Sequence, residues 1–134
     1  MRSWKKYVKN QKGAQVLEFV AVFPLIIFAF MFIWQMALVA YGIVVTEAAV
    51  RDGARAAAVS EDHESAAREA IDNSSMGVQV NEVDSNVTST SYGEEVIVTL
   101  ETYVPTINVP FIGSLEQTVS SQASMPYEVG DDDS

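Results

Sequence analysis

A glycine and a glutamate five positions apart precede the longest apolar stretch of this chain. Gly13 is followed by Ala14, and Glu18 stands directly before a 27-residue run from Phe19 to Val45. Glycine has no side chain to obstruct a protease that must reach an extended backbone beside a bilayer surface. A carboxylate near hydrocarbon is costly, at about 2.5–3.5 kcal/mol for a charge at the centre of a membrane helix and less near the interface. Glu18 therefore needs a compensating partner.

Cleavage after Gly13 would supply such a partner. Ala14 would become the new N-terminus, and Glu18 would lie one helical turn into the mature chain. Its carboxylate could then pair with the α-amino group of an adjacent subunit. The alternative interpretation is that Glu18 only marks the membrane edge and that Gly13 is a chance linker glycine.

The apolar run predicts one transmembrane helix over about residues 19–45. A helix rises about 1.5 Å per residue, so about 20 residues cross a hydrocarbon core. The competing interpretation is a cleavable secretory signal, whose apolar core usually has only about 7–15 residues. The run continues past Ala37 and Ala40, the small residues that could imitate a signal cleavage site. Pro24 lies inside the span and should bend it, which membrane helices tolerate better than soluble ones.

Charge is distributed very unevenly along the chain. The first 12 residues carry five positive charges, whereas residues 13–134 carry three against 18 acidic residues, a net of −15. Lys and Arg resist translocation, so we expect a cytoplasmic basic leader over residues 1–13 and an extracytoplasmic C-terminal part. The acidic outer part argues against a nucleic-acid partner. The chain contains no cysteine, which excludes disulfides, thiolate metal sites and cysteine nucleophiles.

The helical pattern continues beyond the span. We expect one helix over residues 14–59, in which Glu47, Arg51 and Arg55 follow each other at four-residue steps on one face. An exposed pair of this kind contributes only tenths of a kcal/mol. Ser60 is predicted to be the N-terminal cap of a second helix over about residues 61–73. Its apolar stripe consists of Ala66, Ala67, Ala70 and Ile71.

Alternating apolar residues then predict three strands: from Val78 to about Thr88, Glu95–Val104 and Leu115–Pro126. The predicted fold is α+β, with a long transmembrane N-terminal helix that continues outside the membrane, a short second helix and a small three-stranded antiparallel sheet. We expect an extracytoplasmic domain over residues 60–127 and a disordered acidic tail over residues 128–134. Residues 105–113 are expected to form a loop with an apolar tip.

Several other residues could take part in contacts. Arg51 and Arg55 could bind a partner subunit or be solvated helix charges. Phe111 and Ile112, at the loop tip, could contact another subunit or cover an open sheet face. His63 is the single histidine and is expected in an exposed acidic helical turn, with no catalytic role. No phosphate loop, metal cluster or nucleophile elbow is present in the sequence, so we expect no enzyme activity, cofactor, metal site or small-molecule substrate.

Two segments resemble a known family. Gly13–Phe19 (GAQVLEF), with Phe23–Leu25 (FPL), is similar to the N-terminus of the TadE-like family, and Glu47–Arg55 (EAAVRDGAR) is similar to that family's segment after the span. The last predicted strand, with Gln122–Met125 (QASM), resembles the family in pattern only. TadE-like proteins are minor pilins, or pseudopilins, of the tight-adherence (Flp) type IV pilus system.

The resemblance implies a type IV pilin-like structural subunit that is cleaved after Gly13 by a prepilin peptidase. It implies a role in assembling or anchoring a pilus, with membrane lipid and other pilin-like subunits as partners of the N-terminal helix. The family's major pilins are much shorter than this chain, which favours a minor subunit. The alternative function is an uncleaved single-span anchor that presents a small extracytoplasmic interaction domain.

Overall fold

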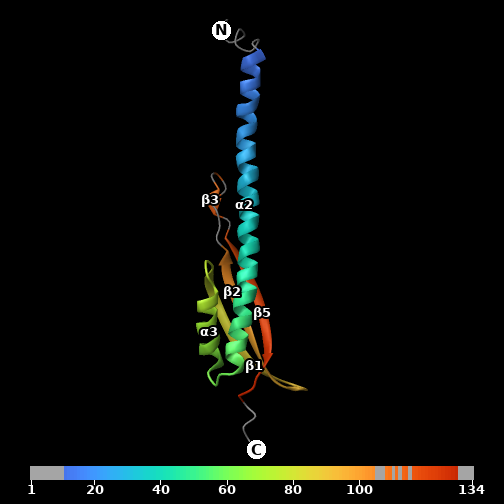
Figure 1. Ribbon diagram of the computed structural model, residues 1–134, viewed down its shortest axis with the longest axis vertical. Helices are drawn as coiled ribbons and strands as arrows, with labels where there is room; N and C mark the ends of the chain where they lie inside the picture. Colours follow the sequence, from blue (N-terminus) through green and yellow to red (C-terminus); the bar gives the residue numbers. More distant parts are fainter. Residues whose placement is uncertain (1–10, 105–107, 110, 112, 115, 130–134) are drawn as a thin grey trace, which may run out of the picture. The chain divides into compact units, whose positions relative to one another are not determined.

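The computed structural model describes residues 11–104, 108–109, 111, 113–114 and 116–129. Two helices are followed by strands (Figure 1). In chain order they are α2 (Gln11–Ala58), α3 (His63–Ser74), β1 (Gln79–Thr90), β2 (Gly93–Val104), β3 (Asn108–Val109), β4 (Gly113–Ser114) and β5 (Gln117–Pro126). The chain divides into two compact units whose boundary lies within α2, between Met36 and Ala37.

The second unit contains the predicted three-stranded sheet. Its strand order is β1-β2-β5, and both pairings are antiparallel. Side chains alternate between the two faces of a strand, so every second residue of β2 points into the core. The buried residues of β2 are Val96, Val98, Leu100, Thr102 and Val104. The α+β fold predicted from the sequence is confirmed, as is the strand predicted over Glu95–Val104.

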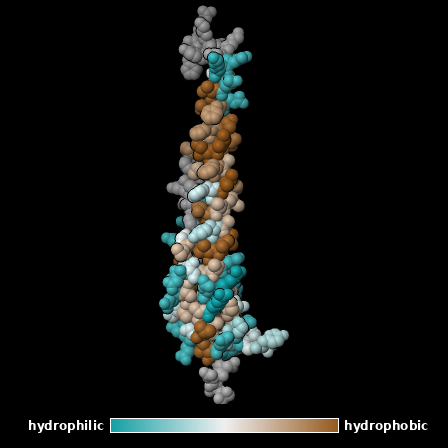
Figure 2. Space-filling view, viewed as in Figure 1, coloured by the Kyte–Doolittle hydropathy of each residue, from teal (hydrophilic) through white to brown (hydrophobic). Residues whose placement is uncertain are grey.

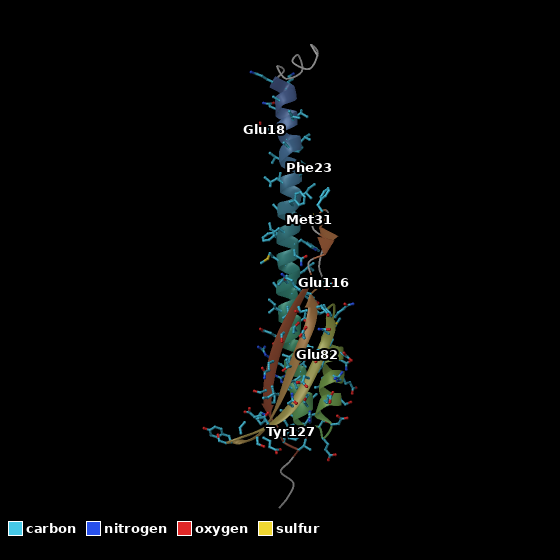
Figure 3. All side chains as sticks on the ribbon, turned by 180° about the vertical axis from the view of Figure 1, so that it is seen from behind. Glu18, Phe23, Met31, Glu82, Glu116 and Tyr127 are labelled. Atoms are coloured by element: carbon cyan, nitrogen blue, oxygen red, sulfur yellow. The ribbon has the colours of Figure 1, made fainter. Side chains whose placement is uncertain are left out.

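The C-terminal part of α2 and the whole of α3 cover one face of the sheet (Figures 1 and 3). Small side chains on α2 allow the close approach, and Gly53 is the tightest point. A Cβ atom added at Gly53 would lie 2.8 Å from the Ile71 side chain on α3. Glycine normally weakens a helix by about 1 kcal/mol, but here it makes room for the largest fully buried side chain. The core residues are Ala49, Val50, Ala54, Ala57, Ala58, Ala67, Ile71, Val83, Val96, Val98 and Leu100.

A buried pair of hydroxyls also joins α2 to the sheet. Thr46 and Thr102 are both fully buried, and their Oγ1 atoms are 2.6 Å apart. Thr46 Oγ1 also donates to the carbonyl oxygen of Gly42, at 2.7 Å. Because a hydroxyl has one proton, Thr102 must donate to Thr46. The side chain of Val104 packs where Gly42 has no Cβ, at 3.1 Å from the position of that missing atom.

The second helix differs slightly from its prediction. It begins at His63, and its cap is Asp62 rather than Ser60, with Asp62 Oδ1 accepting from the Ser65 N–H at 3.2 Å. Ser and Asp cap helices about equally well, so tertiary contacts decide between them. The Ser60 carbonyl accepts from the Tyr127 hydroxyl at 3.1 Å. Of the predicted apolar stripe, Ala67 and Ile71 are fully buried, whereas Ala66 and Ala70 are half-buried.

Residues 105–113 contain more structure than the expected loop. β3 and β4 pair in antiparallel fashion, with Asn108 opposite Ser114 and Val109 opposite Gly113. Phe111 stands between them with a positive φ of 74°, and Ile112 lies outside the described residues. The expected acidic tail begins with an ordered contact, since the Glu128 N–H donates to the Ala58 carbonyl at 3.0 Å. Residues 130–134 lie outside the described residues.

Candidate assembly segment

The residues predicted for cleavage, amine pairing and the helix bend all lie on α2, in the first of the two units. Gly13, Ala14, Glu18 and Pro24 are exposed, and the helix is continuous through all four. Figure 3 labels Glu18 and Phe23 on this part of α2. Pro24 has no N–H, so the helix gives up one backbone hydrogen bond there without ending.

The predicted scissile bond is helical in this structure. A protease that requires an extended backbone must therefore unwind the helix locally around Gly13 and Ala14. Glycine lowers the cost of this step, because it is about 1 kcal/mol less favourable than alanine inside a helix. Gly13 thus offers both the open approach predicted from the sequence and a weak point in the helix.

Apolar side chains on every side of α2 lack protein cover in this unit. Fifteen of the large ones are between 43% and 71% exposed (Figure 2). A helix that is hydrophobic on every side belongs in a membrane or a large core. Among the described residues, α2 is the one helix long and apolar enough to cross a membrane. The exposed residues are Val16, Leu17, Phe19, Val20, Val22, Phe23, Leu25, Ile26, Ile27, Phe28, Phe30, Phe32, Ile33, Trp34 and Met36.

Glu18 stands at the N-terminal edge of this apolar surface. It is four residues from Ala14, a spacing that places the two on the same helix face. The next turn carries the Phe19 and Phe23 rings, whose centroids are 6.1 Å apart. Within the described part of the chain, Glu18 makes no salt bridge or side-chain hydrogen bond. Its carboxylate is therefore available to a cation from outside this chain.

The segment after the span divides its residues between core and solvent. Ala49 and Ala54 are buried against α3 and the sheet, as Gly53 is, whereas Arg51 and Arg55 are exposed. Arg51 pairs with Glu47 at 3.7 Å, and both side chains are more than half exposed. Exposed pairs of this kind contribute little to stability. The small residues of this segment thus have a packing role, and the two arginines remain candidates for subunit contacts.

His63 differs from its sequence-based prediction. It is half-buried rather than exposed, its Nδ1 atom lies 2.8 Å from Ser85 Oγ, and its ring packs edge-on against Tyr127. A Ser–His pair can activate a nucleophile only if a substrate reaches the hydroxyl, and Ser85 is 7% exposed. The contact with Ser85 therefore holds the start of α3 against β1, and the ring contact holds it against Tyr127, which follows β5. These contacts could not be predicted from local sequence patterns, because the three residues are far apart along the chain.

The fold and the uncovered helix together define a class of protein. A long apolar N-terminal helix, a short second helix and a three-stranded antiparallel sheet form an α+β, pilin-like arrangement. Residues 13–55 match the family model described as TadE-like protein, so this segment of the chain is similar to the TadE-like family. This family is generally a non-enzymatic component of pilus systems. The curated proteins and the solved structures gave no match to this chain.

Proposed function

We propose that this chain is a minor pilin-like subunit of a tight-adherence type IV pilus. In this function α2 inserts into the membrane through residues 19–45, with the basic leader on the cytoplasmic side and the sheet domain outside. A prepilin peptidase removes residues 1–13, and the mature chain then joins other pilin-like subunits through α2.

The proposal rests mainly on the difference in burial between the N-terminal and C-terminal parts of α2. Most side chains of residues 16–36 are exposed, whereas the last turns of the helix contribute residues to the core of the domain. The match to the TadE-like family spans both parts, from Gly13 to Arg55. A helix that only anchored a domain would need the apolar surface. It would have no need of a carboxylate at the edge of that surface or of a glycine five residues before it.

Glu18 sets the register of the subunit in this proposal. Its carboxylate accepts a charge-assisted hydrogen bond from the α-amino group of a neighbour's Ala14, which offsets the cost of an acid near hydrocarbon. Because both groups lie at the N-terminal end of the helix, the pairing aligns neighbouring helices along their axes. Neutralising Glu18 removes this attraction but leaves the apolar surface intact.

The test compares Glu18→Gln with the wild-type chain in cells that produce the pilus. Membrane insertion should survive, because the neutral side chain is less costly in lipid. Processing should largely survive, because the cut depends on Gly13 and its neighbours. Co-purification with other pilus components should fail.

The matched control is Glu69→Gln, which neutralises an exposed glutamate on α3. It should leave co-purification unchanged. If Glu18→Gln is as silent as the control in every assay, the assembly role assigned to Glu18 is wrong and the uncleaved-anchor alternative gains support.

A further inference from the structure

The hairpin of β3 and β4 presents a fully exposed phenylalanine. Phe111 has a relative exposure of 104% and a φ of 74°. Positive φ is a conformation that glycine adopts easily and that is an outlier for a bulky side chain. Neither backbone preference nor burial within the chain accounts for a phenylalanine here. A contact outside the chain would account for it.

The hairpin leaves the sheet at a defined end of the second unit. β2 ends at Val104, which pairs with Gln117 at the start of β5, and Val104 packs against Gly42 of α2. Three residues connect Val104 to β3, and a chain extends by at most about 3.3–3.6 Å per residue. The hairpin is therefore tethered to the end of the domain at which the apolar run of α2 arrives.

The same end of the domain carries further exposed apolar side chains. Tyr41 is 48% exposed and donates from its hydroxyl to the carbonyl oxygen of Met76, at 2.9 Å. Met76 is 75% exposed, and Tyr103, which pairs with Gln79 just beyond it, is 38% exposed. On α2 itself, Val44 is 66% exposed. This set, which we call the collar, consists of Tyr41, Val44, Met76 and Tyr103.

The charge pattern agrees with this geometry. Residues 102–115 contain no charged residue, although the chain has 18 acidic ones and the flanking positions are Glu101 and Glu116. Tyrosine is enriched where membrane proteins meet the lipid–water interface, because its ring is apolar and its hydroxyl is polar. An uncharged hairpin beside a tyrosine-containing collar, next to a transmembrane span, matches the chemistry of that interface.

We propose that the β3–β4 hairpin and the collar rest in the lipid headgroup region, with Phe111 inserted toward the acyl chains. The domain is then held to the bilayer at two places, by α2 and by the hairpin. This fixes how the domain is oriented on the membrane before the subunit joins its partners. The inference rests on the proposed insertion of α2 into a bilayer.

The chain contains no cysteine, so single cysteines can be labelled specifically. Phe111→Cys would carry an environment-sensitive fluorophore in the full chain, reconstituted at one copy per nanodisc of phosphatidylcholine and phosphatidylglycerol. The matched control is Tyr92→Cys in the β1–β2 turn, where Tyr92 is 100% exposed. That turn lies at the opposite end of the sheet, beside the Glu94 contact with Tyr127. Flotation with lipid first establishes that the chain has inserted, and failure at this step would count against the proposed function.

For inserted chains, a nitroxide-labelled lipid should quench the probe at 111 several-fold more than the probe at 92, and aqueous iodide should show the reverse order. Equal iodide quenching at both positions would overturn the inference. The inference would also be overturned if the probe at 111 were shielded from iodide only in discs with several copies of the chain and were insensitive to the lipid quencher. That result would identify a second subunit as the occupant.

A second probe at Asn108, with and without Phe111→Ser, tests the role of the Phe111 side chain itself. Lipid quenching there should fall several-fold without Phe111, and unchanged quenching would contradict its role.

Discussion

The buried hydroxyl pair between Thr46 and Thr102 allows a sharp test of how α2 is held to the sheet. The Thr46 hydroxyl donates its hydrogen bond to the Gly42 carbonyl, so the Thr102 hydroxyl depends on Thr46 Oγ1 as its acceptor. Valine has nearly the shape of threonine and a similar helix propensity. Replacing either residue with valine therefore removes mainly the hydroxyl.

The two single variants should not cost the same. Thr46→Val leaves the buried Thr102 hydroxyl without a hydrogen-bond acceptor and should lower the free energy of unfolding by about 1–3 kcal/mol. Thr102→Val leaves Thr46 bonded to Gly42 and should cost about 0.5–1.5 kcal/mol, the net value of one hydrogen bond. The double variant replaces both partners by apolar groups of the same shape, which can be nearly neutral. The double variant should therefore be more stable than the Thr46→Val single variant.

The measurement is a double-mutant cycle by urea unfolding of residues 37–134, which form one compact unit. A coupling free energy of at least about 1 kcal/mol is expected. Additivity of the two single changes within about 0.5 kcal/mol would refute the hydrogen-bond assignment. A larger loss from Thr102→Val than from Thr46→Val would refute the direction of donation.

Two further predictions concern the same domain. Gly53→Val places a branched side chain where a single Cβ would already lie 2.8 Å from Ile71. This change should lower the free energy of unfolding of residues 37–134 by about 1–3 kcal/mol. Ala48→Val, at an exposed position on the same helix, is the control and should cost no more than about 0.7 kcal/mol; equal losses would show that Gly53 is not tightly packed. A fragment that begins at Ser60 lacks the α2 side of the core, so circular dichroism should show no cooperative melt, whereas residues 37–134 should melt cooperatively. A cooperative melt of the shorter fragment would show that α3 and the sheet form a sufficient core alone.

The parts of the fold with a clear period were predictable from the sequence. Alternation along β2 identified its inward face, and the spacing of Ala67 and Ile71 identified that of α3. These patterns are local, so they need no knowledge of what packs against them. The apolar run likewise indicated a helix whose apolar side chains lack protein cover.

Features that depend on distant partners were missed. Ser60 and Asp62 are both good caps, but in the structure Asp62 Oδ1 accepts from the Ser65 N–H, whereas the Ser60 hydroxyl donates to the Asp62 carbonyl and the Ser60 carbonyl accepts from the Tyr127 hydroxyl. The packing role of Gly53 depends on Ile71 of α3, which is distant in the sequence and lies against it in the fold. The β3–β4 hairpin was missed because each of its strands has only two residues, which is too short for any alternation to appear.

The most direct test of the proposed function is the N-terminus of the native protein. The intact mass of the chain should be measured from cells with an active prepilin peptidase, beside a Gly13→Val variant that places a branched side chain at the cut. The wild-type chain should begin at Ala14, and the variant should keep residues 1–13. A wild-type chain that retains Met1–Gly13 in those cells would contradict processing as a pilin.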